Sequence, residues 1–217
     1  MAISFPVPLA DFFGRLRIAE LVLAPTDPAV ISRTRGGEVL AAQIGNVLWS
    51  GSVALSRAHH GEAAAVQAML ALLRRSGGSF MASPVQRRGP LLDPEGALLG
   101  AAIPQIHIVE ANNRDIRIQN LPAGYTLSPG DYLSFTYGGA PARHAFHQLV
   151  TGAIANGSGV TPAFEVTPPI RPGITLPAAV KLVDPAFKAV LVSTPGYGAF
   201  RRVFADGLSF DFVQTLG

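Results

Sequence analysis

Glycine and proline divide this chain into short segments, and this spacing limits its fold more than any other feature. Of the 217 residues, 23 are glycine and 18 are proline. Both residues interrupt regular structure: glycine because it is conformationally free, and proline because it has no backbone N–H to donate. The apolar runs between them have the length of short strands. We therefore predict a mainly β fold with many turns.

Three strands are predicted in the first part of the chain, at residues 15–23, 38–44 and 47–55. The dipeptide Gly45-Asn46 between the last two favours a hairpin turn, because both residues tolerate the backbone conformation that such turns require. The second and third strands are therefore expected to pair with each other.

Side chains alternate between the two faces of a strand. In the strand at 47–55, Val47, Trp49, Val53 and Leu55 share one face, and Gly51 interrupts this face. A glycine within a strand is typical of a bulge or of a close backbone approach.

The hydrophobic period then changes, which predicts one amphipathic helix. Glu62 lies in its first turn and Arg74-Arg75 in its last, with the signs that the helix dipole favours. Gly77-Gly78 ends the helix, and a short strand at residues 79–82 follows. The apolar residues recur at helical spacing; they are Val66, Met69, Leu70 and Leu73.

A second group of strands follows a loop-like segment. Polar and Gly/Pro turns connect them, and five short strands with such turns suit a small, partly open barrel of the OB type. The five predicted strands are residues 103–109, 115–118, 132–137, 143–150 and 163–167.

Two strongly apolar strands, residues 187–192 and 208–213, are predicted to return to the first domain and cover its open sheet edges. Residues 193–200, STPGYGAF, form a loop by composition. The predicted fold is mainly β. It has a β-sandwich-like domain with one amphipathic helix, residues 1–88 and 185–217, and an inserted small OB-like β-barrel, residues 89–184.

Ionised side chains are scarce. Only 14% of the residues are charged, against about 25% in an ordinary soluble domain, while 48% are hydrophobic. A membrane-spanning helix needs about 20 consecutive apolar residues, and Gly, Pro, Asn or a charged residue interrupts every apolar run here. Obligate interfaces resemble a domain core cut in half. The composition therefore predicts assembly with partners and no membrane insertion.

Charge and cysteine content exclude further classes. The chain has no cysteine, so disulfides, thiolate catalysis and cysteine-ligated zinc are ruled out. The net charge is +3, but the arginines are scattered rather than arranged in a stripe with aromatic residues, so no nucleic-acid binding is expected. The N-terminal sequence MAISFPVPLADFF lacks the basic start and long apolar core of a signal peptide.

Four segments, in order along the chain, resemble the distal tail proteins of siphophage-like bacteriophages. WSGSVALSRAHHGEAAAVQAMLALLRRSGGSFMASP, at 49–84, is similar to their Trp-Gly strand, amphipathic helix and Gly-hydrophobic strand ending near Pro. LSPGDYLSF, at 127–135, is similar to their "aGDYf" turn and strand. VTGAIANGSGVTPAFEVTPPIRP, at 150–172, resembles their Gly-rich turn and P-x-x-R exit. GLSFDFVQTL, at 207–216, resembles their closing "GisFdavE" strand.

Two positions depart from the family pattern. The Trp-Gly doublet is loosened to Trp49-Ser50-Gly51, and Gln214 replaces the final acidic residue. These departures bear on the subtype within the family more than on the fold.

The resemblance implies a structural, non-enzymatic component of a phage virion. Distal tail proteins form a homohexameric ring at the baseplate or tail tip and connect the tail tube to the hub. Residues 1–88 and 185–217 would be the belt domain that makes the ring, and the barrel would project outward. The implied partners are further copies of this chain, the tail tube protein and the hub or tail-tip protein. The ring would be assembled in the bacterial host cytoplasm and reside in the tail.

Two groups of titratable residues are candidate sites. His59, His60 and Glu62 resemble a metal corner, but a helical zinc pair is spaced i and i+4, and adjacent histidines diverge. His144 and His147 with Asp131 suggest acid–base chemistry. Side chains three apart on a strand face opposite sides, so the two imidazoles do not converge.

No G-x-S-x-G or P-loop motif occurs in the chain. We therefore predict no catalytic, metal-binding or cofactor-binding residue, and no cofactor.

Three alternatives to the distal ring remain. One is another tail-tip baseplate protein. A second is a carbohydrate or host-surface binding module, with Tyr125, Tyr132 and Tyr137 as its aromatic platform. A third is a cell-wall hydrolase, which requires paired carboxylates; the acids of the second domain have no diagnostic spacing, and they are chiefly Glu110, Asp115, Asp131 and Glu165.

Trp49 is the single tryptophan. It is either a core or inter-sheet residue, or an anchor at a subunit interface, where tryptophan is enriched.

Overall fold

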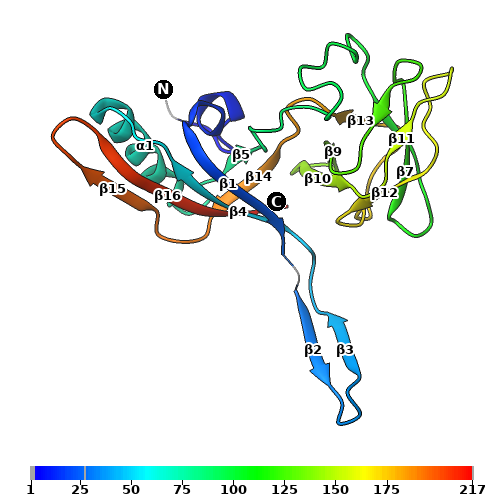
Figure 1. Ribbon diagram of the computed structural model, residues 1–217, viewed down its shortest axis with the longest axis horizontal. Helices are drawn as coiled ribbons and strands as arrows, with labels where there is room; N and C mark the ends of the chain where they lie inside the picture. The colour runs from blue at the N-terminus through cyan, green and yellow to red at the C-terminus, as the bar shows by residue number, and fades with distance from the viewer. Residues whose placement is uncertain (1–2, 27, 217) are drawn as a thin grey trace.

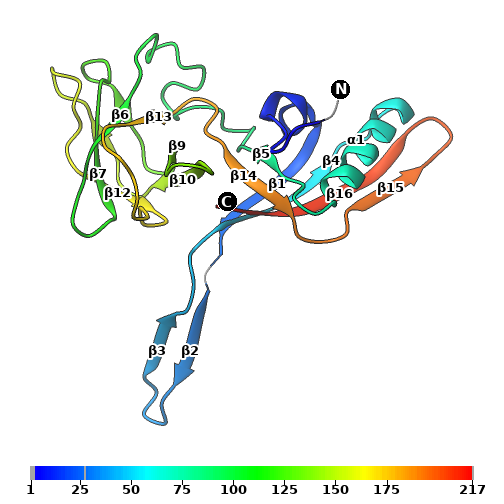
Figure 2. The ribbon, with the colours of Figure 1, turned by 180° about the vertical axis from the view of Figure 1, so that it is seen from behind.

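The protein has two β assemblies and one projecting hairpin, shown from opposite sides in Figure 1 and Figure 2. This computed structural model describes residues 3–26 and 28–216. Strands account for 40% of the chain and helix for 9%, which confirms the predicted mainly β fold. A six-stranded sheet is formed by strands from the N-terminal and C-terminal parts of the chain, and a closed six-stranded barrel is formed by the middle part.

The sheet has the strand order β1-β4-β16-β14-β5, and β15 pairs with β16 outside this path. The two C-terminal strands return to the first domain as predicted, but β16 and β14 lie inside the sheet rather than on its edges. The segment STPGYGAF, predicted as a loop, contains β15. The strands are β1 (Ile18–Pro25), β4 (Trp49–Leu55), β5 (Phe80–Ala82), β14 (Phe187–Leu191), β15 (Gly196–Phe200) and β16 (Ala205–Gln214).

One face of the sheet is covered by helix α1 (His60–Leu73) and by two 3-10 turns, η1 (Leu9–Asp11) and η2 (Phe13–Arg15). The predicted apolar stripe of α1 is confirmed. Leu70 and Leu73 are buried, and Val66 and Met69 pack against the same core. The centre of this core is aromatic; its phenylalanines are Phe12, Phe13, Phe80, Phe146, Phe187, Phe210 and Phe212.

Gly51 makes room for one of these rings. It pairs with Phe212 across the β4–β16 ladder. A Cβ atom at position 51 would lie 2.3 Å from Cζ of Phe212, which is far inside van der Waals contact. The predicted close approach at Gly51 is thus made by an aromatic side chain, and the ladder continues through this position in regular register.

The barrel has the strand order β10-β12-β7-β6-β13-β9 and is closed. All five predicted strands are present. The sixth, β13, pairs with both β6 and β9 and closes the barrel, so the predicted partly open form was wrong in this respect. The barrel strands are β6 (Gln105–Val109), β7 (Asp115–Gln119), β9 (Tyr132–Tyr137), β10 (Arg143–Leu149), β12 (Phe164–Thr167) and β13 (Ala178–Lys181); β8 (Thr126–Leu127) and β11 (Ala153–Ile154) form a separate short ladder.

A hairpin of β2 (Ala29–Arg33) and β3 (Val39–Gln43) projects from the sheet. The predicted pairing of 38–44 with 47–55 through Gly45-Asn46 is wrong. Strand β3 pairs with β2, and β4 pairs with β1. In Figure 1 this hairpin, termed the arm below, extends downward beyond β1 and β4, away from both β assemblies.

The sheet and the barrel meet at a buried junction around Trp49. The indole Nε1 of Trp49 donates to the carbonyl of Phe146 at 2.9 Å, and the Phe146 ring stacks on Tyr132 with 5.2 Å between centroids. Arg171 donates to the carbonyl of Val47 at 2.6 Å. Trp49 is 1% exposed, so the prediction of a core or inter-sheet residue is confirmed.

Candidate interaction surfaces

The arm exposes apolar side chains on both of its faces. The β2–β3 register places Val30 and Leu40 on one face and Ile31 and Val39 on the other. Each of these four side chains is more than half exposed. Apolar surface in contact with water is unfavourable by about 25 cal/mol per Å², so both faces favour burial against another surface.

The described remainder of the chain leaves the arm uncovered, because none of the three hydrophobic core clusters contains a side chain of the arm. An isolated two-stranded hairpin is marginally stable in water. The arm is therefore a surface that a binding partner would both cover and stabilise.

Sequence analysis missed the arm, although a signal was present. Two apolar runs, AVIS and VLAA, flank the tip sequence RTRGGE, and Gly-containing turns between apolar runs are typical of hairpins. The tip closes through Thr34, whose hydroxyl accepts a hydrogen bond from the N–H of Glu38, while Gly37 takes a positive φ of 85°.

Strand β1 provides a second open surface. It forms an edge of the sheet, with β4 as its neighbour on one side. Backbone groups along such an edge can pair with a strand of another chain. Val22 on this edge is 52% exposed, and the charged and proline residues of β1, Glu20 and Pro25, lie toward its two ends.

The segment from Gln86 to Gly100 is a third surface, and two buried carboxylates hold it in place. Asp93 accepts hydrogen bonds from the N–H groups of Leu98 and Leu99 at 3.0 and 2.9 Å. Asp131 accepts from the N–H of Leu91 at 2.8 Å. The fixed segment leaves Leu91, Leu92 and Leu98 exposed.

The Asp93 carboxylate also accepts a hydrogen bond from the hydroxyl of Tyr125 at 3.1 Å. Burial opposes its ionisation, but the hydrogen bonds from Leu98, Leu99 and Tyr125 outweigh burial and lower the pKa of Asp93 below its ordinary value. Burial, together with the negative charge of Asp93, raises the pKa of Tyr125. The pair is thus a carboxylate and a neutral phenol that anchor a surface loop.

The residues of the first titratable group, His59, His60 and Glu62, make separate contacts. The Nε2 of His60 donates to the carbonyl of Arg201 at 2.6 Å, and Glu62 forms an ion pair with Arg17 at 3.0 Å. His59 is the N-terminal flanking residue of α1 and is exposed. Between residues 3 and 216, Asp27 excepted, no three His, Cys, Asp or Glu side chains are grouped as metal ligands would be.

The residues of the second titratable group, His144, His147 and Asp131, also make separate contacts. His147 is buried, and its Nδ1 donates to the carbonyl of Pro168 at 2.6 Å, whereas His144 is only half-buried. Burial lowers the pKa of His147 to about 4 despite this hydrogen bond, and the nearby charge of Arg171 adds to the effect. Asp131 contacts the backbone of Leu91 and Ser128 instead of either histidine.

The three tyrosines do not form an exposed platform. Tyr125 and Tyr137 are buried, and Tyr132 packs against Trp49 and Phe146. The acids of the barrel are separate as well: Glu110 pairs with Arg117 at 3.0 Å, and Asp115 accepts from Asn112 at 2.7 Å. The contacts of these tyrosines and acidic residues therefore stabilise the fold.

Comparisons with known proteins do not identify a relative. No protein-family model matches the chain, and a search of curated proteins found no match. Within the described ranges, the structure contains no helix of the length and hydrophobicity required to cross a membrane.

Proposed function

We propose that this chain is a structural subunit that assembles with copies of itself into the distal ring of a phage-type tail. The ring would be a homohexamer between the tail tube protein and the hub or tail-tip protein. The observation that carries the proposal is the arm, whose two apolar faces have no cover within the described chain. The open edge of β1 and the scarcity of charged residues support it.

The junction supports the proposal from another direction. Three of the four segments on which the family resemblance rests are separate in sequence, yet each contributes a residue to the contact between sheet and barrel. These residues are Trp49, Tyr132 and Arg171. A shared role in one junction gives a physical reason for these motifs to occur together in one chain.

A replaced arm tests the proposal. The N–H of Ile44 donates to the carbonyl of Pro28, so residues 29–43 can be replaced by Gly-Gly without separating the base of the hairpin. We expect native mass spectrometry at micromolar concentration to show a hexamer for the wild type and a monomer for the variant. Both should show the same cooperative unfolding of the sheet and barrel.

Gly157→Ala is a matched control, because this exposed position has open space around it and lies in the barrel. It should assemble like the wild type. A wild-type chain that stays monomeric at these concentrations would contradict the proposed ring, and so would an arm-replaced variant that still forms hexamers.

The carbohydrate-binding alternative receives no support from the geometry, since its proposed tyrosines are buried or packed at the junction.

A further inference from the structure

The edge of β14 next to the C-terminal end of α1 is only partly paired. Strand β5 pairs with β14 at three positions, from Phe187↔Ala82 to Ala189↔Phe80. Beyond Ala189, the chain before β5 turns away through Gly77 and Gly78 toward α1. A groove of about 530 Å³ takes the place of the missing strand, and its walls include Arg74, Gly78, Leu191, Ser193 and Thr194.

Backbone groups of β14 point into this groove. On the side of β16, the backbone carbonyl of Lys188 accepts a hydrogen bond from the N–H of Thr215, and the N–H of Val192 donates to the backbone carbonyl of Asp211. Successive residues of an antiparallel strand direct their N–H and C=O groups to opposite sides. Leu191 therefore points its backbone groups away from β16, and no backbone hydrogen bond to Leu191 from that side occurs in the described chain.

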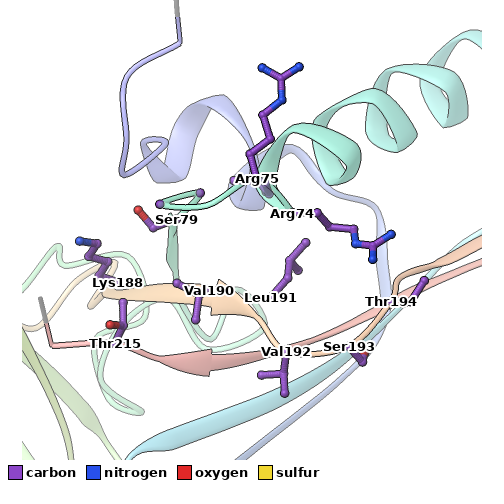
Figure 3. A pocket seen from close by; sticks show the side chains of 13 residues that line it. Arg74, Arg75, Ser79, Lys188, Val190, Leu191, Val192, Ser193, Thr194 and Thr215 are labelled. Atoms are coloured by element: carbon purple, nitrogen blue, oxygen red, sulfur yellow. The ribbon is translucent and has the colours of Figure 1, made fainter.

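The groove also carries an unpaired positive charge. Figure 3 shows the side chain of Arg74 extending toward Thr194 along the groove, while Arg75 points away from β14. Among the described residues, no carboxylate pairs with Arg74, and no acidic residue lines the groove. Ser193 and Thr194 also line the groove, and the Ser193 hydroxyl donates a hydrogen bond to Asp211 at 2.9 Å.

We propose that this groove binds a short extended peptide segment with an acidic side chain, supplied by a partner protein. The peptide would continue the line of β5 as an added strand on β14, using the backbone groups of Leu191 and Ser193. Strand addition of this kind derives affinity from main-chain hydrogen bonds and specificity from side-chain contacts. Its carboxylate would lie against Arg74.

The size of the opening argues for a short segment rather than a second copy of β1. Strand β1 has eight residues, whereas the free edge of β14 extends only from Val190 to the loop at Thr194. The Gly77–Gly78 turn and β5 close one end of the groove. A whole sheet edge does not fit in this space, but a few residues in extended conformation do.

The test uses the full-length chain and the acetylated, amidated hexapeptide Thr-Val-Glu-Val-Thr-Glu, labelled for fluorescence anisotropy. Saturable binding is expected, together with slower hydrogen exchange of residues 187–194. Methylating alternate backbone nitrogens of the peptide should abolish binding. Arg74→Glu should weaken it roughly fivefold to tenfold, as expected when an exposed ion pair becomes a repulsion, and should favour the peptide with lysine in place of glutamate.

Arg114→Glu, on an exposed barrel loop, makes the same change in net charge and should leave peptide affinity unchanged. No binding, equal binding of the methylated peptide, or binding of inorganic phosphate or duplex DNA in place of the peptide would overturn the proposal. The proposal would also be overturned if, without peptide, the protection of residues 187–194 from hydrogen exchange increased with protein concentration. A second copy of the chain would then fill the groove.

The groove goes beyond the proposed ring and does not depend on it. A chain that binds the peptide but remains monomeric would refute the ring alone. A hexamer that does not bind the peptide would refute only the proposed role of the groove.

Discussion

The side chain of Gln214 accepts a hydrogen bond from the backbone N–H of Trp49 at 3.2 Å. Its Nε2 donates to the carbonyl of His144, also at 3.2 Å. Gln214 is 2% exposed. One amide side chain at the end of β16 therefore connects β4 of the sheet with β10 of the barrel, and it does so with one acceptor and one donor.

Gln214→Glu should destabilise the protein, because a carboxylate accepts from Trp49 but has no proton to donate to the carbonyl of His144. Leaving buried polar groups in such a contact unsatisfied costs about 2 kcal/mol, and we expect the free energy of unfolding in urea to fall by this amount. Gln86→Glu, at an exposed position, should change it little. Equal stability of Gln214→Glu and the wild type would show that the amide is not needed.

Gly51→Ala should also destabilise the fold, since the added methyl group collides with the Phe212 ring. Overpacking of this kind costs about 2 kcal/mol. The second change Phe212→Leu should make Gly51→Ala less costly than it is in the wild-type background, and a double-mutant cycle measures this coupling. Additive effects of the changes at positions 51 and 212 would contradict the contact. As a control, Gly61→Ala lies in the first turn of α1, where a methyl group meets no other atom, and it should stabilise the protein by about 0.5–1 kcal/mol.

The buried His147 predicts a loss of stability in mild acid. Its pKa is about 4 in the folded protein and about 6.5 in an unfolded chain. As the pH falls from 6.5 to 4, the unfolded state takes up a proton that the folded state excludes, so stability decreases by up to about 3 kcal/mol. Below pH 4 this contribution no longer changes with pH.

Urea unfolding between pH 7 and 4 measures this effect. His147→Asn keeps a donor for the carbonyl of Pro168 but does not titrate, so its stability should vary less with pH. His144→Gln is the appropriate background, because burial and the charges of Lys188 and Lys181 lower the pKa of His144 as well. The same pH profile with asparagine at 147 would assign the effect to other groups.

Asp93→Asn should loosen the loop from Gln86 to Gly100. The amide retains one acceptor oxygen for three donors, the N–H groups of Leu98 and Leu99 and the hydroxyl of Tyr125. We expect a loss of about 2 kcal/mol and faster hydrogen exchange of the loop amides. Glu95→Gln, exposed on the same loop, should leave the exchange unchanged; unchanged exchange in Asp93→Asn would refute the anchoring role.

Local patterns predicted the elements better than their partners. The helical stripe at Val66, Met69, Leu70 and Leu73 depends on spacing alone, and the structure confirms it. The pairing of residues 38–44 with 47–55 was wrong because Gly45-Asn46 is a good turn sequence, yet Pro28 and Gly45 pack together at the base of the arm. Strand β3 pairs with β2 instead. Strand β2 was not predicted because Pro28, directly before it, is typical of a turn.

Glycine and proline are also the reason that β15 and β13 were not predicted from the sequence. Gly196 and Gly198 lie in β15, where Gly198 has a positive φ of 69° and approaches the carbonyl of Asp206. Both glycines lie where β16 passes too close for a Cβ atom, but in a sequence such residues are typical of loops. The junction was beyond local analysis altogether, because Trp49 and Phe146 are 97 positions apart, and no periodicity relates residues at that separation.

Strands β5 and β14 are antiparallel neighbours, and Ala82 at the end of one faces Phe187 at the start of the other. Everything between these two residues, including the whole barrel, occupies the place of a hairpin turn. A genetic exchange at this point would replace the barrel with a different module, or with a few residues, and leave the order of the sheet strands intact. Only Trp49 and its neighbours at the junction would then need new partners.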